Sequence, residues 1–99
     1  MNRSAAGMLG ILNRAGLLAF GGDVTAKMRK ASLVLLAGDA SENTLGKVMP
    51  LIRQYGVETI TIATKEELGA PLGYPELSCV LLLQGKAAKS FKEKLQKGD

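Results

Sequence analysis

The sequence predicts an α/β fold in which helices cover both faces of a sheet. From Leu33 onward, segments with strand and helix patterns alternate, which is the order that right-handed strand–helix–strand crossovers produce. The run Leu33–Ala37 consists of five apolar residues, so it predicts a strand buried on both faces, in the middle of the sheet. The chain becomes polar directly afterwards, where Asp39 or Ser41 can cap the next helix.

An amphipathic helix is predicted at the N-terminal end. Met8, Ile11, Leu12 and Ala15 follow the i, i+3, i+4, i+7 spacing of a helix face, and we expect this helix to end at Gly16. Polar residues interrupt the apolar run and no small-residue cleavage site closes it, so we do not interpret it as an export signal. No segment is long enough to span a membrane.

A short strand and a short helix are predicted next. Residues 17–20 are expected to form the strand, which ends at Gly21 and Gly22. Asp23 is expected to cap a helix that runs to about residue 30, with Val24 and Met28 facing inward.

The helix after the central strand carries an apolar stripe. The stripe consists of Leu45, Val48, Met49 and Ile52. We expect the helix to run to about Tyr55 and to stop at Gly56. Pro50 lies inside it and predicts a kink or a broken turn.

The C-terminal half supplies two strands and two helices. Polar and apolar residues alternate in the first strand, and Thr64 can cap the helix that follows it. A loop with Tyr74 and Pro75 precedes the last strand. The predicted elements are a strand at 57–63, a helix at 65–72, a strand at 78–83 and a helix at 86–97.

Size and composition narrow the class of protein. The 99 residues fit one small domain, residues 1–99, and the net charge of +4 favours a polyanionic partner, although small basic domains without one are common. With one cysteine, the chain cannot form an internal disulfide, which fits a reducing cytoplasm. Since there is also no histidine, zinc sites and histidine-based catalysis of the ordinary kinds are excluded. Cys79 lies in a buried strand and is expected to be an inert core thiol. No nucleophile–base pair is visible, so we predict neither an enzyme nor a cofactor.

Several segments taken together resemble a known family. They are Arg14-Ala-Gly16, Gly21, Lys27, Leu33–Ala37 with Asp39-Ala-Ser41, Thr64-Lys-Glu-Glu-Leu-Gly69 with Gly73, and Gly85-Lys-Ala-Ala-Lys89. In this order and at nearly the family's spacing, they resemble the kink-turn RNA-binding ribosomal proteins of the L-seven-Ae / L-thirty-e superfamily. The match is best with its small stand-alone bacterial branch, where Asp-Ala-Ser-Glu-Asn-Thr after the central strand is typical. The resemblance covers about residues 8–95.

The resemblance implies a three-layer α/β/α sandwich around a mixed four-stranded sheet. It also implies that two segments bind RNA, namely the turn and helix start after the first strand and the loop before the last strand. The implied RNA-binding residues are Gly21, Gly22, Asp23 and Lys27 in the first segment and Tyr74, Glu76, Leu77 and Ser78 in the second. The implied partner is a structured RNA, kink-turn-like or ribosomal.

The family's binding motif is degenerate in this chain. Asp23 stands where the family has an asparagine, and Val24 stands where it has a glutamate. An asparagine donates and accepts hydrogen bonds at a base edge, whereas an ionised aspartate only accepts them and repels phosphates. Leu77 replaces a residue that is often basic in bacterial relatives, and the helix that carries Lys27 is about one turn shorter than usual. We therefore expect weakened or altered RNA specificity.

Each candidate also has a purely structural interpretation. Gly21 and Gly22 can simply form a tight turn, Lys27 can be solvated, and Tyr74 can pack on its own loop instead of stacking on an unpaired base. The polar residues at 39–44 can form a pocket or only cap a helix. The terminal helix carries Lys86, Lys89, Lys92, Lys94 and Lys97. Such a run is usually a solvated face, and if functional it adds salt-dependent attraction to RNA.

Three hypotheses about function follow. The leading one is a cytoplasmic RNA-binding protein associated with the ribosome or with translation. The second is a protein-interaction module that keeps the fold but has lost RNA recognition, which the departures at Asp23 and Val24 motivate. The third and weaker hypothesis is a domain that binds an anionic metabolite at residues 38–44.

Overall fold

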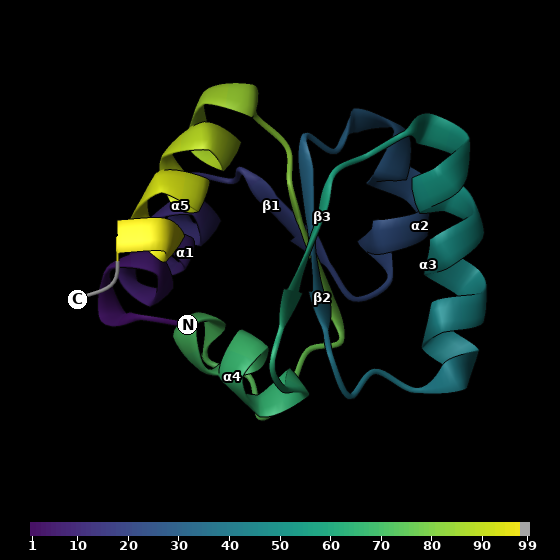
Figure 1. Ribbon diagram of the computed structural model, residues 1–99, viewed down its shortest axis with the longest axis horizontal. Coiled ribbons are helices and arrows are strands. Elements are labelled where there is room, and N and C mark those ends of the chain that lie inside the picture. Colours follow the sequence, from purple (N-terminus) through teal and green to yellow (C-terminus); the bar gives the residue numbers. More distant parts are fainter. Residues whose placement is uncertain (98–99) are drawn as a thin grey trace.

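A mixed four-stranded sheet lies between two layers of helices (Figure 1). The structure, a computed structural model, describes residues 1–97. The strands are β1 (Leu18–Phe20), β2 (Leu33–Ala37), β3 (Thr59–Ile62) and β4 (Cys79–Leu82), in the spatial order β1-β4-β2-β3. The α/β fold, the three layers and the interior position of β2 are therefore confirmed.

Only one of the expected crossovers joins parallel strands. β2 pairs in parallel with β3, but it pairs antiparallel with β4, which in turn pairs antiparallel with β1. The chain returns to the sheet at the end where β2 finishes. The evidence is the N–H of Ala37, the last residue of β2, which donates to the carbonyl of Ser78 at 2.9 Å. β4 starts at that end and has to run in the opposite direction, so the alternation of strands and helices was a wrong guide to this last step.

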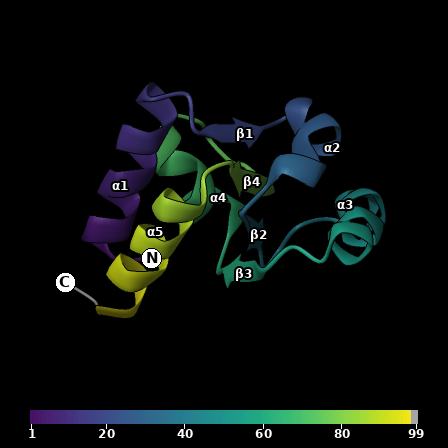
Figure 2. The same ribbon diagram turned by 90° about the horizontal axis from the view of Figure 1, so that it is seen from above.

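The helices are divided unequally between the two faces of the sheet. One face is covered by α1 (Arg3–Arg14), α4 (Lys65–Gly69) and α5 (Gly85–Lys97), and the other by α2 (Asp23–Lys27) and α3 (Glu42–Tyr55) (Figures 1 and 2). Two short 3₁₀ turns, Met28–Lys30 and Ala70–Leu72, extend α2 and α4. Among residues 1–97, no helix combines the length and apolar character needed to cross a membrane.

Alternating side chains of the strands divide the core into two clusters. Leu33 and Leu35 of β2 face the α1–α4–α5 layer, where Phe91 is fully buried. Val34 and Leu36 face the α2–α3 layer. The predicted inward residues of that layer are confirmed, since Val24, Met28, Val48 and Ile52 are all buried in the second cluster.

The structure identifies the N-cap residues of α2 and α3. It corrects the prediction for α2 and decides between the two candidates for α3. Gly22, not Asp23, is the N-cap residue of α2, and it makes no side-chain capping bond. The helix starts one residue early because the N–H of Val24 already donates to the carbonyl of Gly21 at 3.3 Å. Of the two candidates for α3, Ser41 is the cap, since its Oγ accepts from the N–H of Thr44 at 3.2 Å. Asp39 instead accepts from the N–H of Lys65 at 2.8 Å.

One prediction within a helix is wrong, and one of two alternatives is excluded in another. α1 buries Ala5, Leu9 and Leu12, while Ile11 is 59% exposed, so the helix presents the neighbouring face to the sheet. α3 continues from Glu42 to Tyr55 without a break at Pro50 and ends at Gly56 as predicted. Pro50 is tolerated because it and the residue four positions earlier are exposed, so water can bind the carbonyl that lacks an N–H partner.

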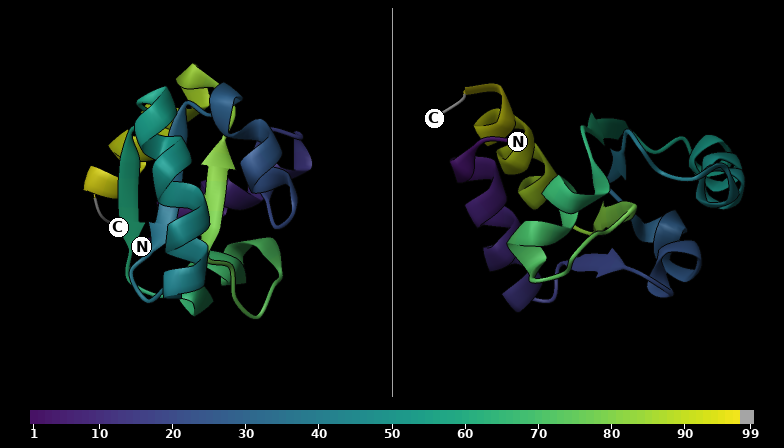
Figure 3. Two further views of the ribbon diagram at one scale, coloured as in Figure 1. Left: turned by 90° about the vertical axis from the view of Figure 1, so that its right-hand side faces the viewer. Right: turned by 90° about the horizontal axis from the view of Figure 1, so that it is seen from below.

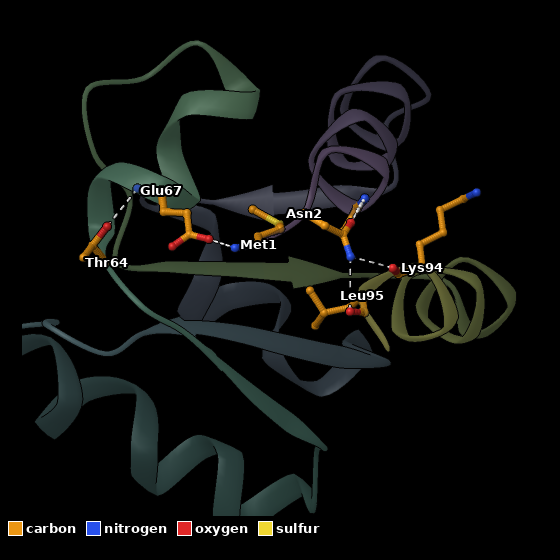
Figure 4. A network of polar contacts seen from close by, with 7 residues as sticks. Met1, Asn2, Thr64, Glu67, Lys94 and Leu95 are labelled. Carbon is orange, nitrogen blue, oxygen red and sulfur yellow. Dashed lines mark hydrogen bonds and ion pairs between the residues drawn. The ribbon is translucent and has the colours of Figure 1, made fainter. Parts of the chain in front are cut away.

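Polar contacts tie the start of α1 to the end of α5. The Asn2 carboxamide accepts from the N–H of Ala5 at 2.8 Å and donates to the carbonyls of Lys94 and Leu95 at 2.8 and 3.2 Å (Figure 4). The Met1 ammonium pairs with the Glu67 carboxylate on α4. Asn2 therefore caps one helix and binds the last carbonyls of another, which fixes the two helices side by side in antiparallel directions.

Candidate nucleic-acid interface

A cleft of about 300 Å³ opens on the α2–α3 side of the molecule. It lies between the turn after β1, the first half of α3 and the loop before β4; α2 and α3 stand in front of the sheet in Figure 3. Its lining residues are Gly21, Val24, Thr25, Thr44, Lys47, Val48, Glu76, Leu77, Ser78 and Cys79. We call it the α2–α3 cleft. Two segments that are far apart in the chain, the turn and the loop, thus line the same cleft.

The turn after β1 forms the first wall. Gly21 has a φ of +65°, a conformation that L side chains rarely adopt and that glycine adopts without strain. Gly22 has an ordinary helical conformation, with a φ of −65°. Val24, two residues after Gly22, is only 5% exposed and packs into the core beneath α2. The position that holds a glutamate in the resembling family is therefore an apolar anchor in this chain.

The loop before β4 forms the second wall, and its backbone is held at several points. The N–H of Tyr74 donates to the carbonyl of Gly69 at 3.1 Å, and the N–H of Leu77 donates to the carbonyl of Lys65 at 3.0 Å. Gly69 permits this close approach, because a Cβ atom there would lie 2.8 Å from the Tyr74 carbonyl oxygen and 2.9 Å from the backbone of Glu76. The loop is thus positioned by α4 before any ligand binds.

One face of α3 forms the third wall. Thr44, Lys47 and Val48 have the i, i+3, i+4 spacing that places them on the same side of a helix. Thr44 is held by Ser41, whose hydroxyl donates to the Thr44 hydroxyl at 3.1 Å. Lys47 is exposed and is the one cation among the described residues that line the cleft. It is the lining side chain best suited to a phosphate.

The remaining lining groups keep the cleft close to neutral. The Glu76 carboxylate lies 4.0 Å from the ammonium of Lys65, which offsets part of its charge. Burial raises the pKa of the Cys79 thiol to about 12, so this group is uncharged at neutral pH, as expected for a core thiol. The cleft therefore offers shape and apolar surface, with Lys47 and Glu76 as its two charges.

Only half of the predicted site residues line the cleft. Gly21, Glu76, Leu77 and Ser78 do so. The others lie outside the lining: Gly22, Asp23, Lys27 and Tyr74 are all exposed.

Tyr74 has an unexpected partner. Its ring packs edge-on against Phe20 of β1, with ring centroids 5.3 Å apart and an interplanar angle of 69°. It therefore contacts the strand before the turn rather than only its own loop, and it remains 46% exposed. This aromatic pair joins the segment that contains the turn to the segment that contains the loop.

Sequence reasoning missed six lining residues of the cleft: Val24, Thr25, Thr44, Lys47, Val48 and Cys79. The predicted apolar stripe already placed Val48 on the inward side of α3. Lys47 precedes it and lies one helical turn after Thr44, so helical spacing could have placed both of them beside the cleft.

Two of the polar residues at 39–44 are already engaged in local hydrogen bonds. The Asp39 carboxylate and the Ser41 hydroxyl both accept hydrogen bonds from backbone N–H groups. Their geometry is that of structural caps, which weakens the metabolite hypothesis.

The lysine-rich helix α5 lies on the opposite side of the sheet from the cleft (Figure 2). Its Lys92 ammonium pairs with the Glu58 carboxylate at 2.8 Å. Any attraction that α5 exerts on RNA therefore acts at another face of the molecule.

The fold and the cleft define a small three-layer α/β/α sandwich protein with a recess beside the turn after its first strand. Residues 10–92 match the Ribosomal protein L7Ae/L30e/S12e/Gadd45 family, and the chain belongs to this family. The resemblance seen in the sequence is thereby confirmed.

Two individual proteins illustrate the relationship. The chain is 31% identical over 91 residues to the RNA-binding protein YlxQ of Enterococcus faecium, with 89% of this chain and 88% of that protein covered. The solved structure of a protein with unknown function from Bacillus halodurans C superposes with a TM-score of 0.79 at 21% identity. That superposition covers 90% of this chain and 93% of the other, and it is a likeness of fold.

Proposed function

We propose that this chain is a cytoplasmic RNA-binding protein that recognises a structured, kink-turn-like RNA through the α2–α3 cleft and works at the ribosome or in translation. The observation that carries the proposal is the cleft itself, because it joins the two segments that the family resemblance assigns to RNA. Membership in a ribosomal protein family and 31% identity to a protein named for RNA binding support it.

In this proposal the turn meets the RNA first. The backbone at Gly21 and Gly22 offers close approach, since a Cβ added at either position would meet nothing within 4 Å. Lys47 in the cleft lining and Lys27 at the end of α2 supply positive charge toward phosphates. The loop residues Glu76, Leu77 and Ser78 close the second side of the site.

Altered specificity is part of the proposal. Asp23 is exposed beside the turn, where an ionised carboxylate accepts hydrogen bonds but donates none. The buried Val24 side chain packs into the core and offers no hydrogen bond to a base edge. We therefore expect recognition to depend more on the shape of the RNA and on apolar contact than in family members with the complete motif.

The test is a titration with three RNAs: a kink-turn, the same RNA without its tandem G·A pairs, and a plain duplex. Each titration is run at two salt concentrations, because the phosphate contribution depends strongly on salt. Preference for the intact kink-turn supports the proposal, and equal binding to all three RNAs contradicts it. Asp23→Asn is expected to raise the affinity for the kink-turn by up to about tenfold by restoring a donor.

Two variants test the residue assignment. Lys27→Glu and Tyr74→Ala should each weaken kink-turn binding, the first through charge and the second through loss of the aromatic contact with Phe20. Unchanged affinity in both would remove these residues from the site while leaving the cleft as the candidate.

A second candidate function is supported by the apolar part of the cleft. Val24, Val48 and Leu77 line it together, which suits a protein side chain as well as a base. On this view the domain is an interaction module that has lost RNA recognition. Partners that copurify after nuclease treatment, and that are lost in Lys47→Glu, would favour it over the RNA proposal.

A further inference from the structure

The charge of the protein is concentrated on two helices. α1 and α5 carry seven basic side chains and one acidic one, Glu93, a net +6. The basic residues are Arg3, Arg14, Lys86, Lys89, Lys92, Lys94 and Lys97, and we call this set the α1–α5 face. Because the whole chain has a net charge of only +4, the rest of the molecule, including the α2–α3 cleft, carries −2.

The two helices present these charges on one side of the molecule. They lie next to each other in the outer layer (Figure 2), and Asn2 binds the start of α1 to the end of α5. Because the helices are antiparallel, Arg14 lies toward the end of α5 that carries Lys86 in its first turn. The inward sides of both helices are occupied by core residues such as Leu9 and Phe91. The basic side chains are therefore left on the outside.

The lysines of α5 extend over a length that suits a nucleic-acid backbone. Lys86, Lys89 and Lys97 are exposed, and the first and last are eleven residues apart, which is three turns and roughly 16 Å along the helix axis. Glu93 is the one acid within the described bounds of the two helices, and it lines a small surface pocket together with Lys94 and Lys97. Lys92 is already paired with Glu58.

We propose that the α1–α5 face is a second RNA-binding surface, which holds the phosphate backbone of a duplex without reading its sequence. The choice of RNA as the polyanion rests on the proposed function. Since this face and the α2–α3 cleft are on opposite sides of the sheet, one molecule holds two RNA segments at once: a shaped element in the cleft and a neighbouring helix on α1 and α5.

An anionic membrane is the alternative polyanionic surface, and the structure favours RNA over it. Helices that lie in a membrane interface insert an apolar side between the lipids. The apolar sides of α1 and α5 are packed against the sheet, and Ile11 is the one exposed large apolar side chain among the described residues of these helices. The face is thus suited to backbone phosphates in water and not to insertion.

The first experiment measures binding of a plain RNA duplex to the full chain and to the triple variant Lys86→Glu/Lys89→Glu/Lys97→Glu. All three positions are exposed, and circular dichroism with thermal melting establishes that the variant is folded. We expect duplex affinity to fall by at least about tenfold, and the slope of log K against log salt to decrease by about one per lysine removed. The control Lys86→Arg/Lys89→Arg/Lys97→Arg keeps the charge and should bind like the unmodified chain.

The second experiment separates this inference from the proposed function. A labelled kink-turn RNA and a labelled duplex are mixed with the protein, and energy transfer between them reports a ternary complex. The triple glutamate variant should lose the ternary complex while it keeps its preference for the kink-turn. Duplex binding that depends on α5 without any kink-turn preference would leave the inference standing and refute the proposed function.

Two results would overturn the inference. The first is a duplex affinity that is equal in the unmodified chain and the triple glutamate variant. The second concerns vesicles that contain phosphatidylserine. If the triple glutamate variant loses binding to these vesicles but keeps binding to the duplex, the face is assigned to a membrane.

Discussion

The two helical layers differ in how they are built and in what they offer a ligand. The α2–α3 layer packs through the smaller apolar cluster and includes the short helix α2, and its cleft carries one cation and one anion. The α1–α4–α5 layer packs through the larger cluster and holds the excess of positive charge, and Asn2 ties its two long helices, α1 and α5, to each other.

This difference separates shape from charge. The positive charge is concentrated on α5, whereas the concave surface of the α2–α3 cleft lies on the other side of the sheet. In the proposed arrangement, the two contributions to nucleic-acid binding occupy opposite sides of one sheet. Selectivity would then depend on the α2–α3 layer and non-selective attraction on the α1–α5 face.

The largest expected effect concerns the two cores. Phe91→Ala removes a fully buried ring from the larger cluster and should lower the free energy of unfolding by about 3–5 kcal/mol. Val48→Ala removes two methyl groups from the smaller cluster and should cost only about 1.5 kcal/mol. Urea denaturation of the two variants measures the contrast. Equal losses would show that the layers do not differ in how they stabilise the fold.

The next effect concerns charge within the cleft. Lys47→Glu replaces its cation with a second carboxylate beside Glu76 and should weaken binding of kink-turn RNA by about tenfold, or about 1.4 kcal/mol. Arg53→Glu makes the same change in charge on α3 outside the cleft and is the matched control. Fluorescence anisotropy with the same RNA measures both variants. An equal loss in the control would mean that only net charge matters on this layer.

A smaller effect tests the tie between α1 and α5. Asn2→Ala removes the cap of α1 and the two bonds to the end of α5, and it should lower the free energy of unfolding by about 1 kcal/mol. The control Asn43→Ala changes an exposed asparagine of α3 and should be nearly neutral. Both are measured by urea denaturation. RNA selectivity should stay unchanged in Asn2→Ala, since the tie lies on the layer opposite the cleft.

The smallest effect is a dependence on alkaline pH at Cys79. Burial raises the pKa of its thiol from 9.0 to about 12, so the unfolded chain loses this proton before the folded one does. Stability should therefore fall as the pH rises above 9, by less than about 1 kcal/mol up to pH 9.5. The difference between the unmodified chain and Cys79→Ala isolates this contribution. A Cys79→Ala variant with the same pH profile would contradict it.

The parts of the fold that could be predicted are those that local chemistry decides. Five successive apolar residues leave no exposed face, so β2 was predicted residue for residue at Leu33–Ala37. The side of α1 that packs inward could not be chosen from the sequence. Met8, Ile11 and Leu12 fit one face, whereas Ala5, Leu9 and Leu12 fit the next, and only the position of the sheet decides between them.

In the candidate site, too, features decided by local sequence could be predicted, and features decided by tertiary packing could not. Gly21 could be identified because a turn that needs positive φ favours glycine, and Val24 and Met28 because their spacing places them on the inward side of a short helix. The contact between Phe20 and Tyr74 could not be foreseen, since it depends on how the edge strand β1 lies relative to a loop more than fifty residues later.

Gly69 has a consequence for how such a site can diverge. Its missing side chain allows the backbone at Glu76 to lie against α4, so the position of one wall is set by a residue outside the cleft lining. A mutation to alanine there would push the wall outward and resize the recess while every contacting residue stayed the same. Homologues with identical contact residues can therefore prefer different ligands, and a comparison limited to those residues would overlook the cause.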